Sequence, residues 1–308
     1  MIRKKRKIIP MISKIRGTGV ALVTPFNKDE SIDFESLSKL VEYQLSNGVN
    51  FIAALGTTSE AATLSENERK EVAYFIAEKV NNRVPVIVGM AGNSTKAVID
   101  SFDSWDLSKF AAILSVVPFY NKPEQEGLKR HFTKIADSCP IPVVLYNVPS
   151  RTGLNMEWDT TVALSYHKNI IAVKEASRDL NQVSKIIRDK ASDFVVLSGD
   201  DSTTLPMISL GGDGVISVAA QAVPEVFSAM VDLALSGDFA KARANHLLMV
   251  DFIDSIFEEG NPAGVKSALN AVGLVDDVLR LPLISVSDQL AGIIKGNVLG
   301  LVPDKILK

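Results

Sequence analysis

Short apolar runs alternate with amphipathic stretches along most of this 308-residue chain. Eight of the runs are apolar at both odd and even positions, which is typical of strands in a parallel sheet covered on both faces. They occupy residues 20–23, 51–55, 84–88, 111–117, 143–146, 170–173, 194–197 and 215–218. Helical patterns lie between them. Asp33 is placed to cap one of these helices, and Ser65 with Glu68 forms a capping box for another.

Eight strand–helix units predict an α/β protein and favour closure into a TIM (β/α)8 barrel. A doubly wound open sheet is the alternative, but its glycine-rich phosphate motif normally follows the first strand, whereas Gly17-Thr18-Gly19 precedes it here. After Gly237 we expect only helices, over 239–257, from Pro262 onwards and over 288–299. The predicted organisation is a catalytic barrel over 15–237 and a C-terminal helical region over 238–308.

Composition and charge exclude several classes of protein. A net charge of −3 gives no overall attraction to nucleic acid or to an acidic membrane. No segment has the roughly 18 uninterrupted apolar residues that a membrane span requires. Three histidines and one cysteine, Cys139, exclude a disulfide framework and leave few ligands for zinc. We therefore expect no nucleic-acid partner, no membrane association, no metal and no organic cofactor, and the cysteine usage is compatible with a cytoplasmic location.

The first residues form a basic run, Arg-Lys-Lys-Arg-Lys over 3–7. The apolar stretch that follows is too short, and too interrupted by Pro10, for a signal peptide. The run alone is open to nuclear targeting or RNA binding, but we interpret residues 1–14 as a disordered, solvated tail. Met11 is an alternative start, since the first patterned strand begins only at Gly19.

The carboxyl ends of the strands are where the active site of such a barrel lies, and Lys174 directly follows the apolar strand 170–173. This position places its amine at the rim of a packed interior. Burial disfavours the charged form of a lysine and can lower its pKa by about 3–5 units. The neutral amine can then attack a ketone and form a Schiff base. The alternative is that Lys174 only pairs with Glu175 or another carboxylate.

Polar residues also follow other strands, and each of them has both a functional and a purely structural interpretation. Tyr146 is either a general acid and base or a half-buried core tyrosine with a satisfied hydroxyl. Thr57 and Thr58 suit a carboxylate, but ordinary turn chemistry explains them equally well. Arg151 offers a bidentate fork for a second carboxylate, or a surface salt bridge. For Asp200-Asp201 we favour a helix cap over a metal site.

Together these segments resemble the dihydrodipicolinate synthase and N-acetylneuraminate lyase family of class I aldolases. The resemblance runs from about Gly17 to the end, with the segments in the family's order, and the Tyr-Asn-x-Pro-x-Arg-Thr pattern resembles the synthase branch. The matching segments are 56–60 (Gly-Thr-Thr-Ser-Glu), 118–123 (Pro-Phe-Tyr-Asn-Lys-Pro), 146–153 (Tyr-Asn-Val-Pro-Ser-Arg-Thr-Gly), 173–176 (Val-Lys-Glu-Ala), 198–201 (Ser-Gly-Asp-Asp), 214–218 (Gly-Val-Ile-Ser-Val) and Asn261-Pro262 with Lys266.

The resemblance implies a role for each of these residues. Lys174 would form the Schiff base with pyruvate, and Tyr146 would transfer protons. Thr58 would link Tyr146 to Tyr120 of a neighbouring subunit, and Thr57 with Thr58 would help to hold the pyruvate carboxylate. Because Tyr120 must reach across an interface, the family also implies a homotetramer built from tight dimers.

The second substrate implied by the family is L-aspartate 4-semialdehyde, on the route to lysine and diaminopimelate. Arg151 would receive its carboxylate, while Gly199 and Ile216 would shape the pocket through backbone and apolar contacts. The family calls for neither a metal nor an organic cofactor.

The chain also departs from the family pattern. Arg178 stands where the segment after the lysine usually has glycine, and Gln221 stands where many members have asparagine. The lysine-feedback pocket of regulated relatives matches poorly, and we therefore expect weak or absent inhibition by lysine. Of its positions Asn93 corresponds, whereas Phe119, Glu66 and Ala97 replace a tyrosine, a histidine and a glutamate.

Three rival functions remain at this point. One is another pyruvate aldolase of the family, acting on N-acetylneuraminate or a 2-keto-3-deoxy sugar acid. Another is a catalytically silent, pyruvate-binding regulatory paralogue, against which the intact Lys174 and Tyr146 argue. The last is a metal-dependent barrel aldolase, which the scarcity of histidine and clustered carboxylates disfavours.

Overall fold

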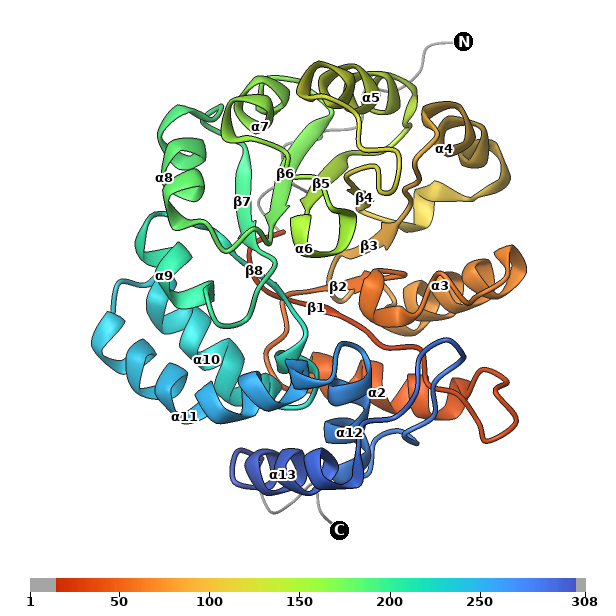
Figure 1. Ribbon diagram of the computed structural model, residues 1–308, viewed down its shortest axis with the longest axis vertical. Helices are drawn as coiled ribbons and strands as arrows, with labels where there is room; N and C mark the ends of the chain where they lie inside the picture. Colours follow the sequence, from red (N-terminus) through yellow and green to blue (C-terminus); the bar gives the residue numbers. More distant parts are fainter. Residues whose placement is uncertain (1–14, 303–308) are drawn as a thin grey trace.

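The computed structural model describes residues 15–302, so the predicted basic tail over 1–14 lies outside the described residues. The predicted barrel is confirmed. Eight parallel strands pair in chain order, and β1 also pairs with β8, which closes the sheet (Figure 1). The strands are β1 (Gly17–Ala21), β2 (Phe51–Ala54), β3 (Val86–Gly89), β4 (Ala112–Val116), β5 (Val143–Asn147), β6 (Ile170–Glu175), β7 (Val195–Ser198) and β8 (Gly214–Ser217).

Helices cover the outside of the barrel and continue beyond it (Figure 1). The α-helices are α2 (Phe34–Ser46), α3 (Glu66–Val80), α4 (Thr95–Ser101), α5 (Gln125–Ser138), α6 (Pro149–Thr152), α7 (Trp158–Ser165), α8 (Leu180–Asp189), α9 (Thr204–Ser209), α10 (Pro224–Leu235), α11 (Phe239–Glu258), α12 (Ala263–Ala271) and α13 (Asp288–Leu299). Short 3-10 turns are η1 (Thr57–Ser59), η2 (Phe102–Ser104), η3 (Leu107–Lys109) and η4 (Ala219–Gln221).

Side chains cap several helix starts, as the sequence predicts for Asp33 and for Ser65 with Glu68. The Asp33 side chain accepts a hydrogen bond from the backbone N–H of Ser36, and the capping box of Ser65 and Glu68 makes both of its bonds. At the start of α11, Asp238 accepts from the N–H of Lys241. Each cap satisfies a backbone donor that the first turn of a helix leaves free.

The inside of the barrel is an apolar core, separate from the larger core between sheet and helices. Large and small residues alternate there. A Cβ added at Gly19 of β1 would lie 2.2 Å from the Phe51 ring of β2, so the ring fills the space that a side chain would need. Such interlocking is how a barrel of eight strands fills its interior.

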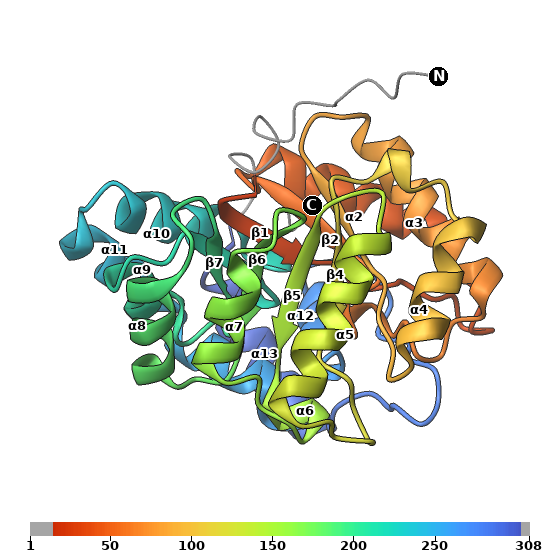
Figure 2. The same cartoon turned by 90° about the horizontal axis from the view of Figure 1, so that it is seen from above.

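The C-terminal region consists of α11, α12 and α13, close to the predicted bounds, with Pro262 as the N-cap of α12. Figure 2 shows α12 and α13 at the same end of the barrel as α6, the end toward which the β5 arrow points. The extension therefore lies at the carboxyl ends of the strands, where the candidate residues gather. None of the helices in the described part is both long enough and apolar enough to cross a lipid bilayer.

Candidate active site

Lys174 lies inside strand β6, with its side chain in the barrel interior. The sequence pattern ended this strand at Val173, but the ladder continues, since Lys174 pairs with Tyr146 on β5 and with Leu197 on β7. Alternation along a strand puts Ala172 and Lys174 on the inner face. The lysine is 4% exposed, and its Nζ lies 4.3 Å from the centre of the Tyr146 ring. The amine is thus held at the mouth of an apolar interior, beside a buried phenol.

Glu175 leaves the opposite face of β6 and is engaged elsewhere. Its carboxylate accepts hydrogen bonds from the side-chain amides of Asn147 and Gln182, at 3.0 Å and 3.2 Å, and from the N–H of Ser177 at 2.7 Å. Burial raises the pKa of the Glu175 carboxyl. This geometry does not support the alternative in which Lys174 pairs with Glu175. Instead, Glu175 ties β5, β6 and α8 together behind the lysine.

Gly199, directly after β7, forms the wall next to the Lys174 side chain. A Cβ at this position would lie 3.0 Å from Lys174 Cγ, 3.1 Å from Lys174 Cε and 2.7 Å from Ala176 Cβ. Only a residue without a side chain fits there without moving the lysine. Ile216 on β8 is fully buried and belongs to the interior core. Gly199 therefore adjoins Lys174, and Ile216 lines the barrel interior.

The turn after β2 separates the two threonines. Thr58 is 2% exposed within η1, whereas Thr57 is exposed to solvent. The Asn261 side-chain amide donates a hydrogen bond of 2.9 Å to Thr58 Oγ1. Arg151, an exposed residue on α6, donates from Nη2 to the main-chain carbonyl of Asn261 at 3.1 Å. Asn261 thus brings together two predicted site residues, although the sequence assigned it no role and marked it only as part of a matching segment.

Tyr120 does not join this buried group within a single chain. Its side chain is 90% exposed, and its backbone is left-handed, with φ of 71°. The loop is anchored to the turn after β3, since the Asn93 amide donates to the Phe119 carbonyl and the Asn121 amide donates to the Asn93 carbonyl. The tyrosine therefore projects outward from an anchored loop.

A second lysine, Lys266 of α12, is completely buried. It forms an ion pair of 2.5 Å with Glu60, donates to the Val278 carbonyl at 2.7 Å and lies 4.2 Å from the centre of the Phe26 ring. Burial lowers the pKa of the Lys266 amine. Because Glu60 follows η1 directly, this pair fastens the C-terminal region to the loop that carries Thr58.

The two departures from the family pattern are accommodated. Arg178 keeps a left-handed backbone, with φ of 65°, where glycine would be free of strain, and its Nε donates to Asp200 at 2.6 Å. Gln221 is buried, where its side-chain oxygen accepts from the N–H of Val23 and its carbonyl accepts from the Gln44 side chain. The loop after Lys174 therefore has the conformation that a glycine would allow.

The helix-cap interpretation covered both aspartates, but neither is the N-cap of α9, the helix that follows them. Asp200 accepts a hydrogen bond from the N–H of Thr203 just before α9, whereas Asp201 reaches the distant turn η4. The Asp201 carboxylate accepts hydrogen bonds from the Ser217 hydroxyl and from the N–H groups of Val218 and Ala219 at the start of η4. Burial raises the pKa of the Asp201 carboxyl to about 6. Asp200 is bound by Arg178. Among residues 15–302, no three potential metal-ligating side chains of His, Cys, Asp or Glu lie together.

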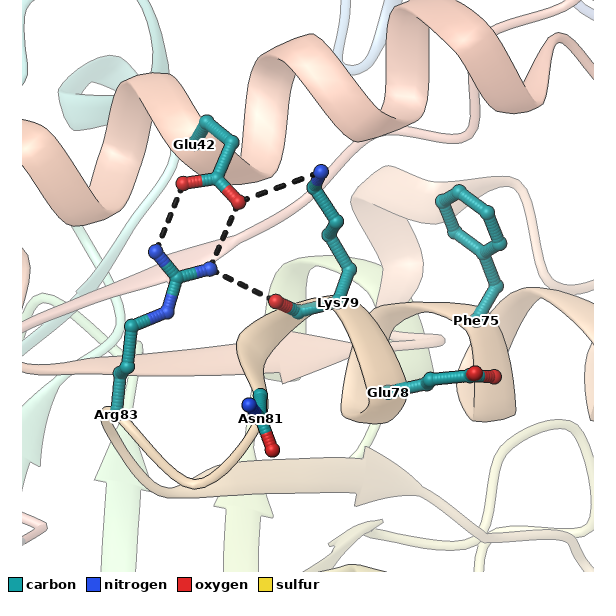
Figure 3. Close-up of a pocket in the computed structure, with 6 residues that line it drawn as sticks. All are labelled: Glu42, Phe75, Glu78, Lys79, Asn81 and Arg83. Carbon is teal, nitrogen blue, oxygen red and sulfur yellow. Dashed lines mark hydrogen bonds and ion pairs between the residues drawn. The ribbon is translucent and has the colours of Figure 1, made fainter.

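A hollow of about 400 Å³ lies between α2 and the end of α3 and is not part of the site. Figure 3 shows the residues that line it. Its charges neutralise one another, since Arg83 makes two hydrogen bonds to Glu42, of 2.8 Å and 2.7 Å, and Lys79 approaches the same carboxylate at 3.4 Å. Arg83 precedes β3, which places the hollow at the amino ends of the strands. Lys174 lies toward the opposite end of the barrel.

A closed parallel barrel with its candidate residues at the carboxyl ends of the strands defines a TIM-barrel enzyme. Residues 14–295 match the Dihydrodipicolinate synthetase family. The chain belongs to this family.

Individual relatives agree with this membership. The 4-hydroxy-tetrahydrodipicolinate synthase of Phocaeicola vulgatus is 48% identical over 273 residues, which are 88% of this chain and 92% of the relative. The crystal structure of dihydrodipicolinate synthase from Thermotoga maritima is 37% identical, with a TM-score of 0.91 over 94% of this chain and 100% of that one. The chloride-inhibited dihydrodipicolinate synthase from Acinetobacter baumannii, solved in complex with pyruvate, is 38% identical, with a TM-score of 0.90 over 94% of this chain and 100% of that one.

Proposed function

We propose that this chain condenses pyruvate with L-aspartate 4-semialdehyde, as a lyase with 4-hydroxy-tetrahydrodipicolinate synthase activity on the route to lysine and diaminopimelate. The family match covers most of the chain, and a relative 48% identical to it bears this name. The observation that carries the proposal is the position of Lys174, buried on the inner face of β6 and adjacent to Tyr146.

In the proposed reaction the Lys174 amine attacks the ketone of pyruvate, and loss of water gives an imine. The protonated imine withdraws electrons, so the neighbouring methyl group loses a proton and becomes an enamine carbon. That carbon attacks the aldehyde of the second substrate. The substrate amine then displaces the lysine by attacking the imine carbon, which closes the ring and frees Lys174.

Tyr146 serves as the acid and base of the proposed reaction. Its ring lies against the lysine amine, which supports a role for its hydroxyl in exchanging protons while the carbinolamine forms and loses water. Thr58 would connect Tyr146 to Tyr120 of a second subunit. The 90% exposure of Tyr120 supports a role that a partner completes, and we accordingly propose a homotetramer of tight dimers.

The two carboxylates of the substrates have separate receptors in this proposal. Thr57 and Thr58 hold the carboxylate of pyruvate beside Lys174, with Gly199 and Ile216 as the walls of its pocket. Arg151 receives the carboxylate of the semialdehyde, for which its planar guanidinium provides two parallel hydrogen bonds. The first carboxylate is thus bound near the barrel and the second farther out.

Arg151 distinguishes this function from that of a sugar-acid aldolase. In Arg151→Ala, the KM for the semialdehyde should rise and condensation should fall on the order of 100-fold or more, because a charge-assisted pair is lost. Imine formation with pyruvate should persist. Arg188→Ala is the matched control, since Arg188 is an exposed arginine on α8 that pairs with Asp189. Normal condensation by Arg151→Ala, or faster cleavage of N-acetylneuraminate than condensation by the parent, would contradict the proposal.

We propose a cytoplasmic location from the cysteine usage, and the division of the chain into a barrel over 15–237 and a helical region over 238–308. Weak or absent inhibition by lysine is checked by assaying turnover against lysine concentration, and strong inhibition at low concentration would refute it. Light scattering tests the tetramer.

A further inference from the structure

Asn261 is a buried polar residue to which the proposed reaction gives no role. It lies between α11 and α12 and is 9% exposed. It contacts two of the proposed carboxylate receptors through two different groups. The side-chain amide donates to Thr58 Oγ1, and the main-chain carbonyl accepts from Arg151.

The side-chain contact fixes what the Thr58 hydroxyl can do. A threonine hydroxyl has one hydrogen to donate and two positions that accept. Because Asn261 donates to Thr58 Oγ1, one accepting position is occupied and the hydroxyl hydrogen stays free. That hydrogen can then be donated to a carboxylate or to a tyrosine oxygen. The asparagine therefore helps to position Oγ1 and leaves the hydroxyl hydrogen free to be donated.

The rest of the asparagine side chain is not held by other groups. Its Oδ1 atom is buried and has no hydrogen-bond partner within residues 15–302. A buried amide kept only for folding normally satisfies both of its ends. Here the one side-chain contact is with Thr58, which points to a role at that hydroxyl.

The segment that carries Asn261 is itself firmly anchored. The buried pair between Lys266 of α12 and Glu60 binds the helix after Asn261 to the residue that follows η1. Asn261 and Thr58 are therefore held on two segments joined at a second, charged point. An amide fixed in this way can orient its neighbour without reorganising when substrate enters.

We propose that Asn261 is a positioning residue for the pyruvate carboxylate. Its side chain orients the Thr58 hydroxyl as a hydrogen-bond donor, and its main-chain carbonyl independently orients Arg151. This inference rests on the proposed function, because it assumes that Thr58 binds pyruvate. Replacing the Asn261 side chain should therefore affect the binding of pyruvate. Binding of the semialdehyde should depend on the main-chain carbonyl, which orients Arg151 and which such a replacement keeps.

The test measures the pyruvate concentration for half-maximal borohydride trapping, without semialdehyde, and then the KM for each substrate. In Asn261→Ala the half-maximal pyruvate concentration for trapping and the KM for pyruvate should both rise roughly 3- to 10-fold, the range expected for one lost hydrogen bond. The KM for the semialdehyde should change little, because the main-chain carbonyl remains. Asn261→Asp should be at least as impaired, since an ionised carboxylate would accept the Thr58 hydrogen instead of donating one.

Two further variants keep the proposal falsifiable. Asn270→Ala is the matched control on α12, where the side-chain amide donates to the Val275 carbonyl, and it should leave both KM values unchanged. Adding Asn261→Ala to Thr58→Val should have no further effect on pyruvate, because both changes remove the same contact. Three results would each overturn the role of Asn261. They are additive effects of Asn261→Ala and Thr58→Val on pyruvate, equal rises in both KM values in Asn261→Ala, or an unchanged KM and trapping concentration for pyruvate in that variant. If the parent protein forms no pyruvate adduct at all, the proposed function fails, and this inference fails with it.

Discussion

The contact between Gly199 and Lys174 gives a prediction whose size follows from the structure. In Gly199→Ala the new Cβ would lie 3.0 Å and 3.1 Å from Lys174 Cγ and Cε, and 2.7 Å from Ala176 Cβ. Carbon atoms in ordinary contact are about 3.5–4.0 Å apart. The lysine stem, the loop with Ala176, or both must therefore move by roughly half an ångström or more.

This displacement should affect catalysis more than folding. Overpacking a full core by one methyl group costs about 1–3 kcal/mol of the free energy of unfolding. A reacting group displaced by about 1 Å can lose on the order of 100-fold in rate. We expect Gly199→Ala to remain folded, with kcat lowered roughly 10- to 100-fold and slower trapping of pyruvate by borohydride. Steady-state kinetics, trapping rates and urea unfolding measure these three effects.

Gly296→Ala is the matched control. Gly296 lies on α13, and a Cβ there would meet nothing within 4 Å. That change should leave kcat unchanged and stabilise the helix by about 0.5–1 kcal/mol. If Gly199→Ala kept the kcat of its parent, the placement of Lys174 beside Gly199 would be wrong.

Further predictions concern stability. Lys266→Met leaves the Glu60 carboxylate buried without its counter-charge. Urea unfolding should therefore show that the free energy of unfolding falls by about 3–5 kcal/mol, and adding Glu60→Gln should largely restore it. A smaller loss in the single variant than in the double variant would refute this. Burial lowers the pKa of His131 from 6.5 to about 4. Below pH 6.5 the imidazole takes up a proton in the unfolded chain before it does so in the folded protein. The contribution of the neutral His131 to stability is therefore complete above pH 6.5 and is lost as the pH falls toward 4, by up to about 3 kcal/mol. His131→Gln should remove that part of the pH dependence of the free energy of unfolding. An unchanged dependence in this variant would show that His131 does not cause it. Arg178→Gly relieves a left-handed backbone but removes the ion pair between the exposed Arg178 and the buried Asp200. Because the Asp200 carboxylate keeps its hydrogen bonds from the Ser202 hydroxyl and the Thr203 N–H, the free energy of unfolding should change by less than about 1 kcal/mol; a loss of several kcal/mol would show that the ion pair dominates.

The barrel could be predicted from the sequence because each buried parallel strand leaves its own local signal. That signal is less informative at strand ends. Lys174 and Glu175 interrupt the apolar pattern, so the sequence ended β6 at Val173, while the pairing of Tyr146 with Lys174 carries the strand through both residues. The lysine is consequently deeper in the interior than a residue after the strand would be.

Long-range polar contacts could not be predicted in this way. The amide of Asn261 meets Thr58 across 203 positions of sequence, and Lys266 meets Glu60 across 206. No local periodicity reports such a contact, and a single asparagine has many ordinary explanations. The contacts of Tyr120 could not be predicted for a different reason. The residues that an exposed side chain meets in a neighbouring subunit can be identified only in the assembled oligomer.

The most direct test of the central claim is reduction with borohydride in the presence of pyruvate, followed by peptide mapping. Within residues 15–302, Lys174 and Lys266 are both buried, and the second is held in an ion pair with Glu60. We predict one pyruvate-derived adduct, on Lys174, which disappears in Lys174→Ala together with product formation. An adduct on Lys266, no adduct, or a Lys174→Ala protein that forms product as fast as its parent would contradict this prediction.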